Sequence, residues 1–144
     1  MKTETITVSA SHKEIYIPCN QLRILLADAR VSIGNINLCE LALRELLTNL
    51  VELAYEGNAT GKIRVNLAYS PSRVVIETHD TGKPAQIVIG RNDSTNPLDL
   101  KEGDYGTAIM QSLVDEVVYT FGKGTNTWKL VKKLRKQEKH VESV

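Results

Sequence analysis

The sequence of 144 residues predicts an α+β fold, a two-layer sandwich in which helices cover one face of a mixed or antiparallel sheet. Three observations lead to this prediction. Short β-leaning stretches open the chain, two segments with helical periodicity follow, and two hairpin patterns come later, separated by a long loop and a further helix. The length suits one domain over residues 1–144, with a charged and frayed tail at 135–144.

The first part of the chain combines strand-like and helical patterns. ITVSA (6–10) and EIYIP (14–18) are short and β-leaning. Pro18 opens a predicted helix over 19–31, in which Asn20 is a candidate N-cap. The helical spacing in this segment is carried by Leu22, Leu25, Leu26 and Ala29.

The strongest helical pattern is NLCELALRELLTNLVELAYEG, residues 37–57, which follows a predicted short loop at residues 34–35. Its abundant Leu, Ala and Glu residues favour a helix. Asn37 can cap the start of this helix and Gly57 can end it. At about 100° per residue, one broad face is apolar. That face comprises Leu43, Leu46, Leu47, Leu50, Leu53 and Ala54.

The second half of the chain is predicted as two hairpins with a long loop and a helix between them. Residues 62–70 alternate apolar and polar side chains, and 73–80 are rich in β-branched residues, so the two form a hairpin. Residues 81–105 are mostly turn formers, and a loop of that length in a compact domain is usually a functional lid or a disordered segment. The remaining predicted elements are a helix over 106–119 that runs into a strand near 116–121, a turn at 123–126 and a strand over 127–134.

Composition argues against several function classes. The net charge of +1 creates no global field that would favour nucleic acid or a membrane surface. No apolar run approaches the roughly 20 residues that span a bilayer, and the polar N-terminus lacks the apolar stretch of a signal peptide. Cys19 and Cys39 lack metal-type spacing, so we interpret them as packed, reduced thiols of a cytoplasmic protein. The basic residues near the C-terminus indicate a solvated strand end rather than a nucleic-acid interface.

A polar stripe runs along the predicted helix over 37–57, opposite its apolar face. Glu45, Asn49 and Glu52 lie at positions i, i+4 and i+7. This stripe has three interpretations. It is a solvated helix face, or a carboxylate and an amide oxygen that suit a hard cation such as Mg²⁺, or the site of a general base. The helical pattern alone does not decide among them.

The sequence HDTGKP places Asp80 at a strand end, two residues before Gly82. A buried carboxylate in this place can accept a hydrogen bond from an exocyclic amine such as that of adenine. Glycine lets the chain pass close to a flat ring because it has no Cβ atom. An ordinary Asp-x-Gly turn is the alternative interpretation.

A second glycine segment, EGDYGTAIMQSL, leads into the last predicted helix. Gly103 and Gly106 precede Thr107, the first residue of that helix. Free amides at a helix N-terminus attract anions, and flanking glycines let phosphates approach. Asp104 argues against an anion site because a carboxylate repels phosphate, and the alternative is that Gly106 only fits a tight entry to the helix.

In their order along the chain, these segments resemble the GHKL superfamily of histidine-kinase-like ATPases. Within it, the chain looks most like the anti-sigma-factor serine/threonine kinases. The resemblance covers about residues 10–134. Its matching segments are ELLTNLVELAY (45–55), DTGKP (80–84) and GTAIMQSLVDEV (106–117).

The resemblance implies ATP and Mg²⁺ as cofactors and assigns a role to each candidate residue. Asn49 would bind the Mg²⁺ that bridges the phosphates, and Glu45 would act as general base or orient the attacking hydroxyl. Asp80 would hold the adenine amine, and Gly82 would give the base room. Further nucleotide contacts would come from an ATP lid at 83–105 and from Gly103, Gly106 and Thr107.

The resemblance also implies protein partners. The protein would hold a sigma factor inactive and would phosphorylate a serine of a small antagonist domain. The family is often homodimeric, and the apolar residues of 15–31 are one candidate contact surface, with core packing as the alternative. Neither nucleic acid nor a membrane is expected as a direct partner.

Three departures from the family pattern support an alternative function. Leu53 stands where many members have histidine. Asp104, Tyr105, Gly106 and Thr107 stand where Gly-x-Gly-Leu is usual, and no basic residue adjoins Gly106. These departures imply a lower ATP affinity or turnover, and the altered glycine segment motivates the alternative of a partner-switching module that does not transfer phosphate, either nucleotide-bound or nucleotide-free. A third hypothesis is a generic interaction domain, and the long polar segment at 81–105 argues against it.

Overall fold

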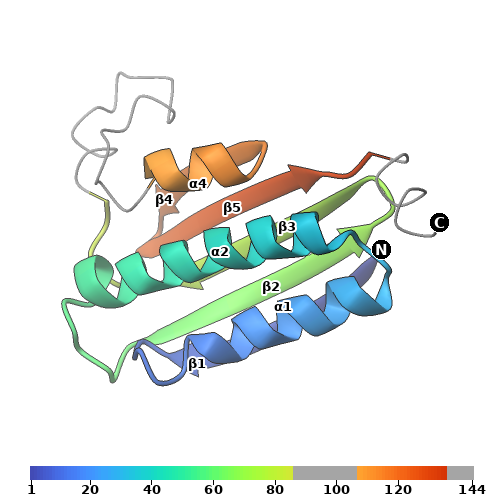
Figure 1. The fold of residues 1–144 in the computed structure, drawn as a ribbon. Coiled ribbons are helices and arrows are strands. Elements are labelled where there is room, and N and C mark those ends of the chain that lie inside the picture. The colour runs from blue at the N-terminus through green and yellow to red at the C-terminus, as the bar shows by residue number, and fades with distance from the viewer. Residues whose placement is uncertain (86–106, 136–144) are drawn as a thin grey trace, which may run out of the picture.

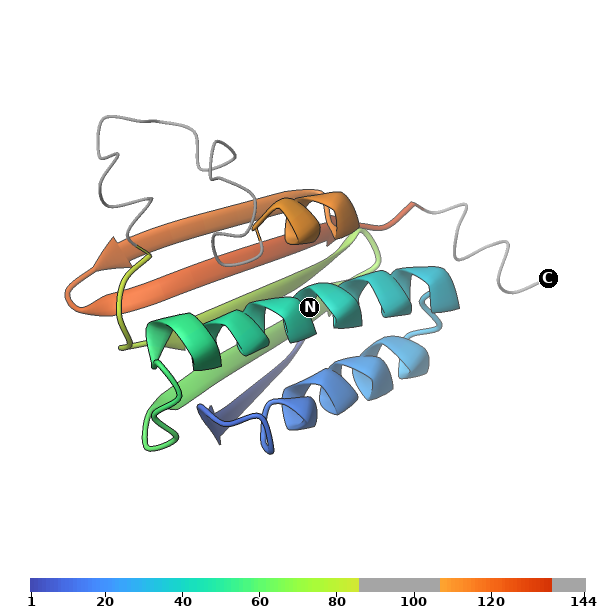
Figure 2. The same cartoon turned by 60° about the vertical axis from the view of Figure 1, so that its left-hand side comes forward.

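The computed structural model describes residues 1–85 and 107–135, which form a two-layer α+β sandwich (Figures 1 and 2). The predicted fold class is therefore confirmed. The strands of the described residues form one antiparallel sheet in the order β1-β2-β3-β5-β4, so the choice between a mixed and an antiparallel sheet is settled. The strands are β1 (Lys2–Ser9), β2 (Lys62–Ser70), β3 (Arg73–Asp80), β4 (Glu116–Gly122) and β5 (Thr125–Lys133).

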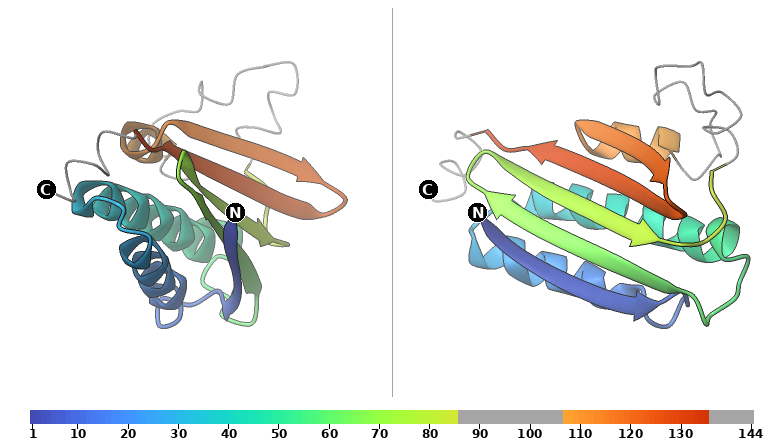
Figure 3. Two further views of the ribbon diagram at one scale, coloured as in Figure 1. Left: turned by 90° about the vertical axis from the view of Figure 1, so that its right-hand side faces the viewer. Right: turned by 180° about the vertical axis from the view of Figure 1, so that it is seen from behind.

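The helices of residues 1–85 and 107–135 all lie on one face of this sheet, and none of them covers the other face (Figure 3). The core lies between the two layers, where leucines of the helices meet the inward residues of the strands. The helical elements are α1 (Tyr16–Asp28), α2 (Ile33–Asn49), η1 (Leu50–Ala54) and α4 (Thr107–Leu113).

The start of α1 corrects two predictions. Residues 14–18 do not form a strand, because α1 begins at Tyr16 and Pro18 lies in its first turn. Proline is tolerated there since the first amides of a helix have no intrahelical acceptor. Asn20 lies inside the helix and does not cap it. The buried side chains recur at helical spacing from the start, at Ile15, Pro18, Cys19, Leu22, Leu25 and Leu26.

The start of α2 also lies earlier than predicted. The helix begins at Ile33, so the expected loop at residues 34–35 is its first turn. Ser32 is the N-cap, and its hydroxyl accepts a hydrogen bond from the Asn35 amide at 3.1 Å. Asn37, the predicted cap, instead accepts a hydrogen bond from Arg23.

The last turn of the long helix changes its geometry. After Asn49 the backbone continues as the π-helix η1, a wider turn that is common at functional sites. Leu53, predicted on the apolar face, is 40% exposed, whereas Ala54 is buried. Gly57 follows with a φ of +82°, and its amide donates to the Val51 carbonyl at 2.9 Å, so the predicted helix stop is confirmed.

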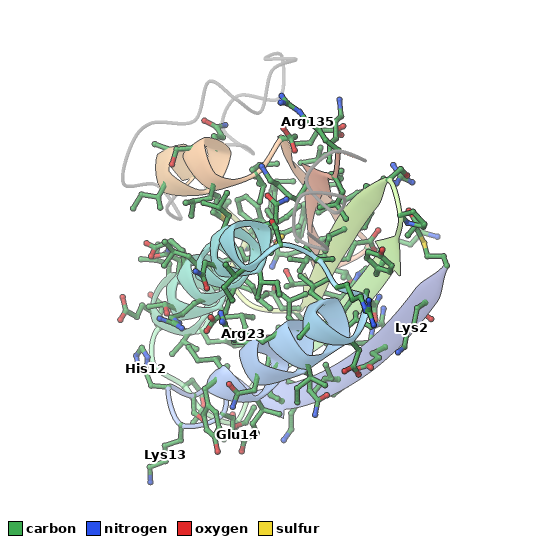
Figure 4. The ribbon with its side chains drawn as sticks, turned by 45° about the vertical axis from the view of Figure 1, so that its right-hand side comes forward. Lys2, His12, Lys13, Glu14, Arg23 and Arg135 are labelled. Atoms are coloured by element: carbon green, nitrogen blue, oxygen red, sulfur yellow. The ribbon has the colours of Figure 1, made fainter. Side chains whose placement is uncertain are left out.

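Polar contacts join α1 to α2 at the surface of the helical layer. Arg23 lies between the two helices (Figure 4) and donates a hydrogen bond to the Glu40 carboxylate at 2.6 Å. Arg44, one turn after Glu40, pairs with the same carboxylate. These two partners lower the pKa of Glu40 in spite of its partial burial.

Cys19 and Cys39 are free and buried in the core, which confirms the prediction of packed thiols. Burial raises the pKa of the Cys19 thiol to about 11 and that of the Cys39 thiol to about 12. No helix in residues 1–85 or 107–135 combines the length and the hydrophobicity that a bilayer crossing requires.

Candidate functional site

The candidate residues that the structure describes gather at one end of the sandwich. The end of α2, the end of β3 and the first turn of α4 all lie at this end (Figures 1 and 2). A backbone hydrogen bond joins the turn after β3 to η1, which continues α2, because the Lys83 amide donates to the Ala54 carbonyl at 2.6 Å. Asp80 closes β3, Asn49 closes α2 and Thr107 opens α4.

Asp80 is a buried carboxylate of the site. Its side chain is 2% exposed and points to the helix-covered face of the sheet. The Oδ2 atom accepts hydrogen bonds from the Gly82 amide at 2.9 Å and from the Asn126 side chain at 3.0 Å. The Oδ1 atom is buried and has no partner among the described residues. Burial raises the pKa of Asp80, and the hydrogen bonds from Asn126 and Gly82 partly oppose this shift.

The turn after Asp80 has its backbone amides fully engaged. The Thr81 amide donates to the Tyr55 hydroxyl at 3.0 Å, and the Ala85 amide donates to the Tyr119 hydroxyl at 3.1 Å. The Gly82 and Lys83 amides bond to the Asp80 carboxylate and the Ala54 carbonyl, and Pro84 has no amide hydrogen. Every backbone N–H group from 81 to 85 therefore has an acceptor, whereas Asp80 Oδ1 beside this turn is a buried acceptor without a partner among the described residues.

Gly82 is required by the fold at this turn. A Cβ atom at this position would lie 2.7 Å from the Ala54 carbonyl oxygen and 2.9 Å from its carbonyl carbon. Any larger residue would therefore push the turn away from the end of η1. Sequence reasoning attributed this glycine to the approach of a flat ring, whereas the structure shows a close approach of two backbone segments.

Glu45 and Asn49 lie one turn apart on α2, and both are partly buried. The Asn49 amide nitrogen donates to the Glu45 carbonyl at 2.9 Å. This bond uses the nitrogen and leaves the amide oxygen, the atom that Mg²⁺ prefers, as the acceptor of the side chain. No group of three or more His, Cys, Asp or Glu side chains in the described part of the chain could hold a metal ion. A cation at Asn49 would therefore need further ligands from substrate phosphates and water.

Thr107 is fully buried and begins α4, which packs against α2. Its position at the start of this helix agrees with the predicted helix entry. Gly103 and Gly106, and the predicted lid beyond residue 85, lie outside the described residues.

Sequence reasoning missed Asn126, Tyr119 and Tyr55. Asn126 was assigned to a turn, but it lies in β5, directly opposite Asp80 on β3. A polar residue in the inward row of β5, ahead of Trp128 and Leu130, was the available signal. Tyr55 was quoted as part of the helix motif without a role. Its hydroxyl donates to the Lys62 carbonyl at 2.7 Å while it accepts the Thr81 amide.

Comparisons with known proteins identify the family and agree with the fold. The sequence profile of the family described as "Histidine kinase-like ATPase domain" matches residues 14–132. The fold is similar to the crystal structure of the RsbU and RsbW domains of Rv1364c from Mycobacterium tuberculosis, with a TM-score of 0.68 and 24% sequence identity. That match covers 93% of this chain and 33% of the other, so the chain spans about a third of that protein's solved length.

A second solved structure, the catalytic domain of the histidine kinase ThkA, matches with a TM-score of 0.49 and 11% identity. It covers 92% of this chain and 96% of the other. No curated protein sequence matches the chain.

Gly82→Ala is expected to destabilise the protein by about 1–3 kcal/mol, because the added methyl group meets backbone atoms that cannot move aside independently. Urea unfolding measures the change. Gly34→Ala is the matched control, since a Cβ atom at Gly34 meets nothing within 4 Å and the position lies inside α2. Alanine there should stabilise the protein by up to about 1 kcal/mol. Equal effects of the two substitutions would contradict the assigned contact.

Asp80→Asn is expected to raise the melting temperature by a few degrees at neutral pH. The pKa of Asp80 is raised in the folded state, so the folded protein binds more protons than the unfolded chain as pH rises from the ordinary pKa of Asp to the raised value. The free energy of unfolding of the wild type therefore falls as pH rises through that window, and it stays lower at higher pH. Asparagine removes the buried charge, and its advantage should vanish below the ordinary pKa of Asp. Thermal unfolding at neutral and acidic pH measures this difference, and a lower melting temperature of the variant at neutral pH would contradict it.

Proposed function

The chain belongs to the histidine kinase-like ATPase domain family, and from this premise we propose that it binds ATP with Mg²⁺ at the end of β3 and α2. One observation carries the proposal: Asp80 Oδ1 is a buried acceptor with no partner among the described residues. An unpaired buried acceptor costs roughly 1–3 kcal/mol, so a protein keeps one where a ligand supplies the donor.

The exocyclic amine of adenine is a suitable donor for this oxygen. The amine is small, flat and carries two hydrogens, and the surrounding turn offers no open backbone N–H group between 81 and 85 that would compete for an acceptor. A hydrogen bond to an ionised acceptor is stronger than one between neutral groups. Base recognition at Asp80 is therefore favourable as well as selective.

The phosphates would extend from the base towards α2 and α4. Asn49 would contribute its amide oxygen to Mg²⁺, since its nitrogen is already bonded to the Glu45 carbonyl. Thr107 opens α4 on the side of this site, and Gly103 and Gly106 precede it in sequence. When bound, Mg²⁺ supplies charge neutralisation at the phosphates.

Glu45 would act as general base for a serine hydroxyl that attacks the γ-phosphate. Phosphoryl transfer depends mainly on positioning and electrostatic stabilisation, so one carboxylate beside a metal ligand can suffice. The accepting serine would belong to an antagonist domain, and the protein would sequester a sigma factor in exchange. This part of the proposal depends on the resemblance of residues 45–55, 80–84 and 106–117 to anti-sigma-factor serine/threonine kinases. Such partners would place the protein in the cytoplasm.

The second candidate function is a partner-switching module that does not transfer phosphate. The sequence around Gly106 favours it, because Asp104 adds a carboxylate to the segment that the resemblance assigns to the phosphates. Exposed Leu53 is also consistent with this candidate, since a leucine there provides no polar group to the site.

Asn49→Ala is expected to weaken ATP binding in the presence of Mg²⁺ by about 10- to 100-fold, the effect of losing a ligand to a charged group. Isothermal titration calorimetry with and without Mg²⁺ measures the change. Asn66→Ala is the matched control, because Asn66 faces the uncovered side of the sheet and bonds to His79. ATP binding that is unchanged in the Asn49 variant, or absent from the wild type, would refute the proposed site.

Glu45→Gln is expected to lower phosphate transfer to an antagonist domain by about 100-fold or more, because it removes the base but keeps the shape of the side chain. ATP affinity should stay within a few-fold of wild type. Radiolabelled γ-phosphate on the antagonist domain provides the measurement. A wild-type protein that binds ATP and the antagonist domain but transfers no phosphate would favour the module without transfer activity.

A further inference from the structure

Asn126 is a buried amide whose two ends both have partners. Its side chain is 1% exposed. The nitrogen donates to Asp80 Oδ2 at 3.0 Å and to the Gly82 carbonyl at 2.9 Å. The oxygen accepts a hydrogen bond from the Tyr119 hydroxyl at 2.5 Å. Asn126 therefore holds the carboxylate and the turn that follows it in one arrangement.

The orientation of this amide follows from its surroundings. A flipped Asn126 would place its oxygen against two acceptors, the Asp80 carboxylate and the Gly82 carbonyl. The Tyr119 hydroxyl already accepts the Ala85 amide at 3.1 Å, which leaves its own hydrogen for Asn126. The Tyr119 ring lies against Trp128, with ring centroids 4.6 Å apart. The donor and acceptor of each hydrogen bond in this series are therefore fixed: Ala85 donates to Tyr119, Tyr119 donates to Asn126, and Asn126 donates to Asp80.

This direction of hydrogen bonding determines whether Asp80 Oδ1 is a donor or an acceptor towards a ligand. A carboxyl group as buried as this one tends to hold a proton, and a protonated oxygen would donate a hydrogen bond as well as accept one. Two donors on Oδ2, from Asn126 and Gly82, oppose this effect of burial and stabilise the ionised form. An ionised Asp80 offers Oδ1 only as an acceptor.

We propose that Asn126 and Tyr119 are positioning residues that keep Asp80 an acceptor-only group, so that the site selects a purine with an amine at C6 over one with a carbonyl. An amine at C6 places a donor against Asp80 Oδ1, whereas a carbonyl places a second acceptor there. A site that forms a hydrogen bond with a donor of its ligand strongly disfavours an analogue that has an acceptor in the same place. The inference rests on the proposed binding of ATP.

The test compares the affinities for ATP and ITP, whose bases carry an amine and a carbonyl at C6. Calorimetry with Mg²⁺ on the wild type should show ATP binding about 10- to 100-fold tighter than ITP. Asn126→Leu keeps the side-chain size but removes the donors. In this variant the ATP-to-ITP affinity ratio should fall to about threefold or less, because Asp80 can then hold a proton and donate to the carbonyl. A purely structural role would lower both affinities together and leave the ratio unchanged.

Asn66→Leu is the matched control, since it makes the same change on the uncovered face of the sheet. It should retain the wild-type ratio. Tyr119→Phe provides a second test that stays valid if Asn126→Leu does not fold. It removes the hydroxyl that donates to Asn126 and accepts the Ala85 amide, and the ratio should fall to a value between those of the wild type and Asn126→Leu.

A folded Asn126→Leu protein with the wild-type ratio would overturn this inference while leaving ATP binding intact, and so would an unchanged ratio in Tyr119→Phe. A wild-type protein that binds neither nucleotide would overturn the proposed function and this inference together. A wild type that binds ATP and ITP equally would overturn only the inference of selectivity.

Discussion

The pairing of Asp80 with Asn126 across β3 and β5 is the constraint on which the rest of the site depends. The two residues lie directly opposite each other in the antiparallel register. A shift of one residue in that register would send one of them to the uncovered face of the sheet. The pairing also orients the turn after β3, because Asn126 holds both the carboxylate and the Gly82 carbonyl. The architecture of the sheet thus determines where the open carboxylate oxygen points.

The turn after Asp80 is also held from the helical layer. The Ala54 carbonyl at the end of η1 and the Tyr55 hydroxyl just beyond it each accept an amide of this turn. η1 directly follows Asn49. The same continuous helix therefore carries Asn49, the candidate metal ligand, and holds the turn after Asp80, the candidate contact to the base. This connection links the segment that carries Asn49 to the turn after Asp80 by hydrogen bonds.

The buried Asp80 carboxylate lowers the stability of the free protein. A buried carboxylate with one unpaired oxygen is unfavourable in the free protein, and its raised pKa reflects that cost. The surrounding hydrogen bonds do not remove the cost, because they all engage Oδ2 and the backbone of the turn. If Asp80 only held the turn together, a side chain with Oδ2 as its one acceptor and no Oδ1 would serve equally well. Retention of the carboxylate is understandable when a ligand provides the missing donor.

The sequence by itself determined the fold class, the long helix with Glu45 and Asn49, and the turn at Asp80 and Gly82, because these features depend on local periodicity and turn chemistry. Only the tertiary structure decided the start of α1, since five residues at 14–18 fit a strand or a helix equally well until their burial is known. It also decided the role of Asn126. That residue lies 46 positions from Asp80, and pattern along a chain carries no information about which strands become neighbours.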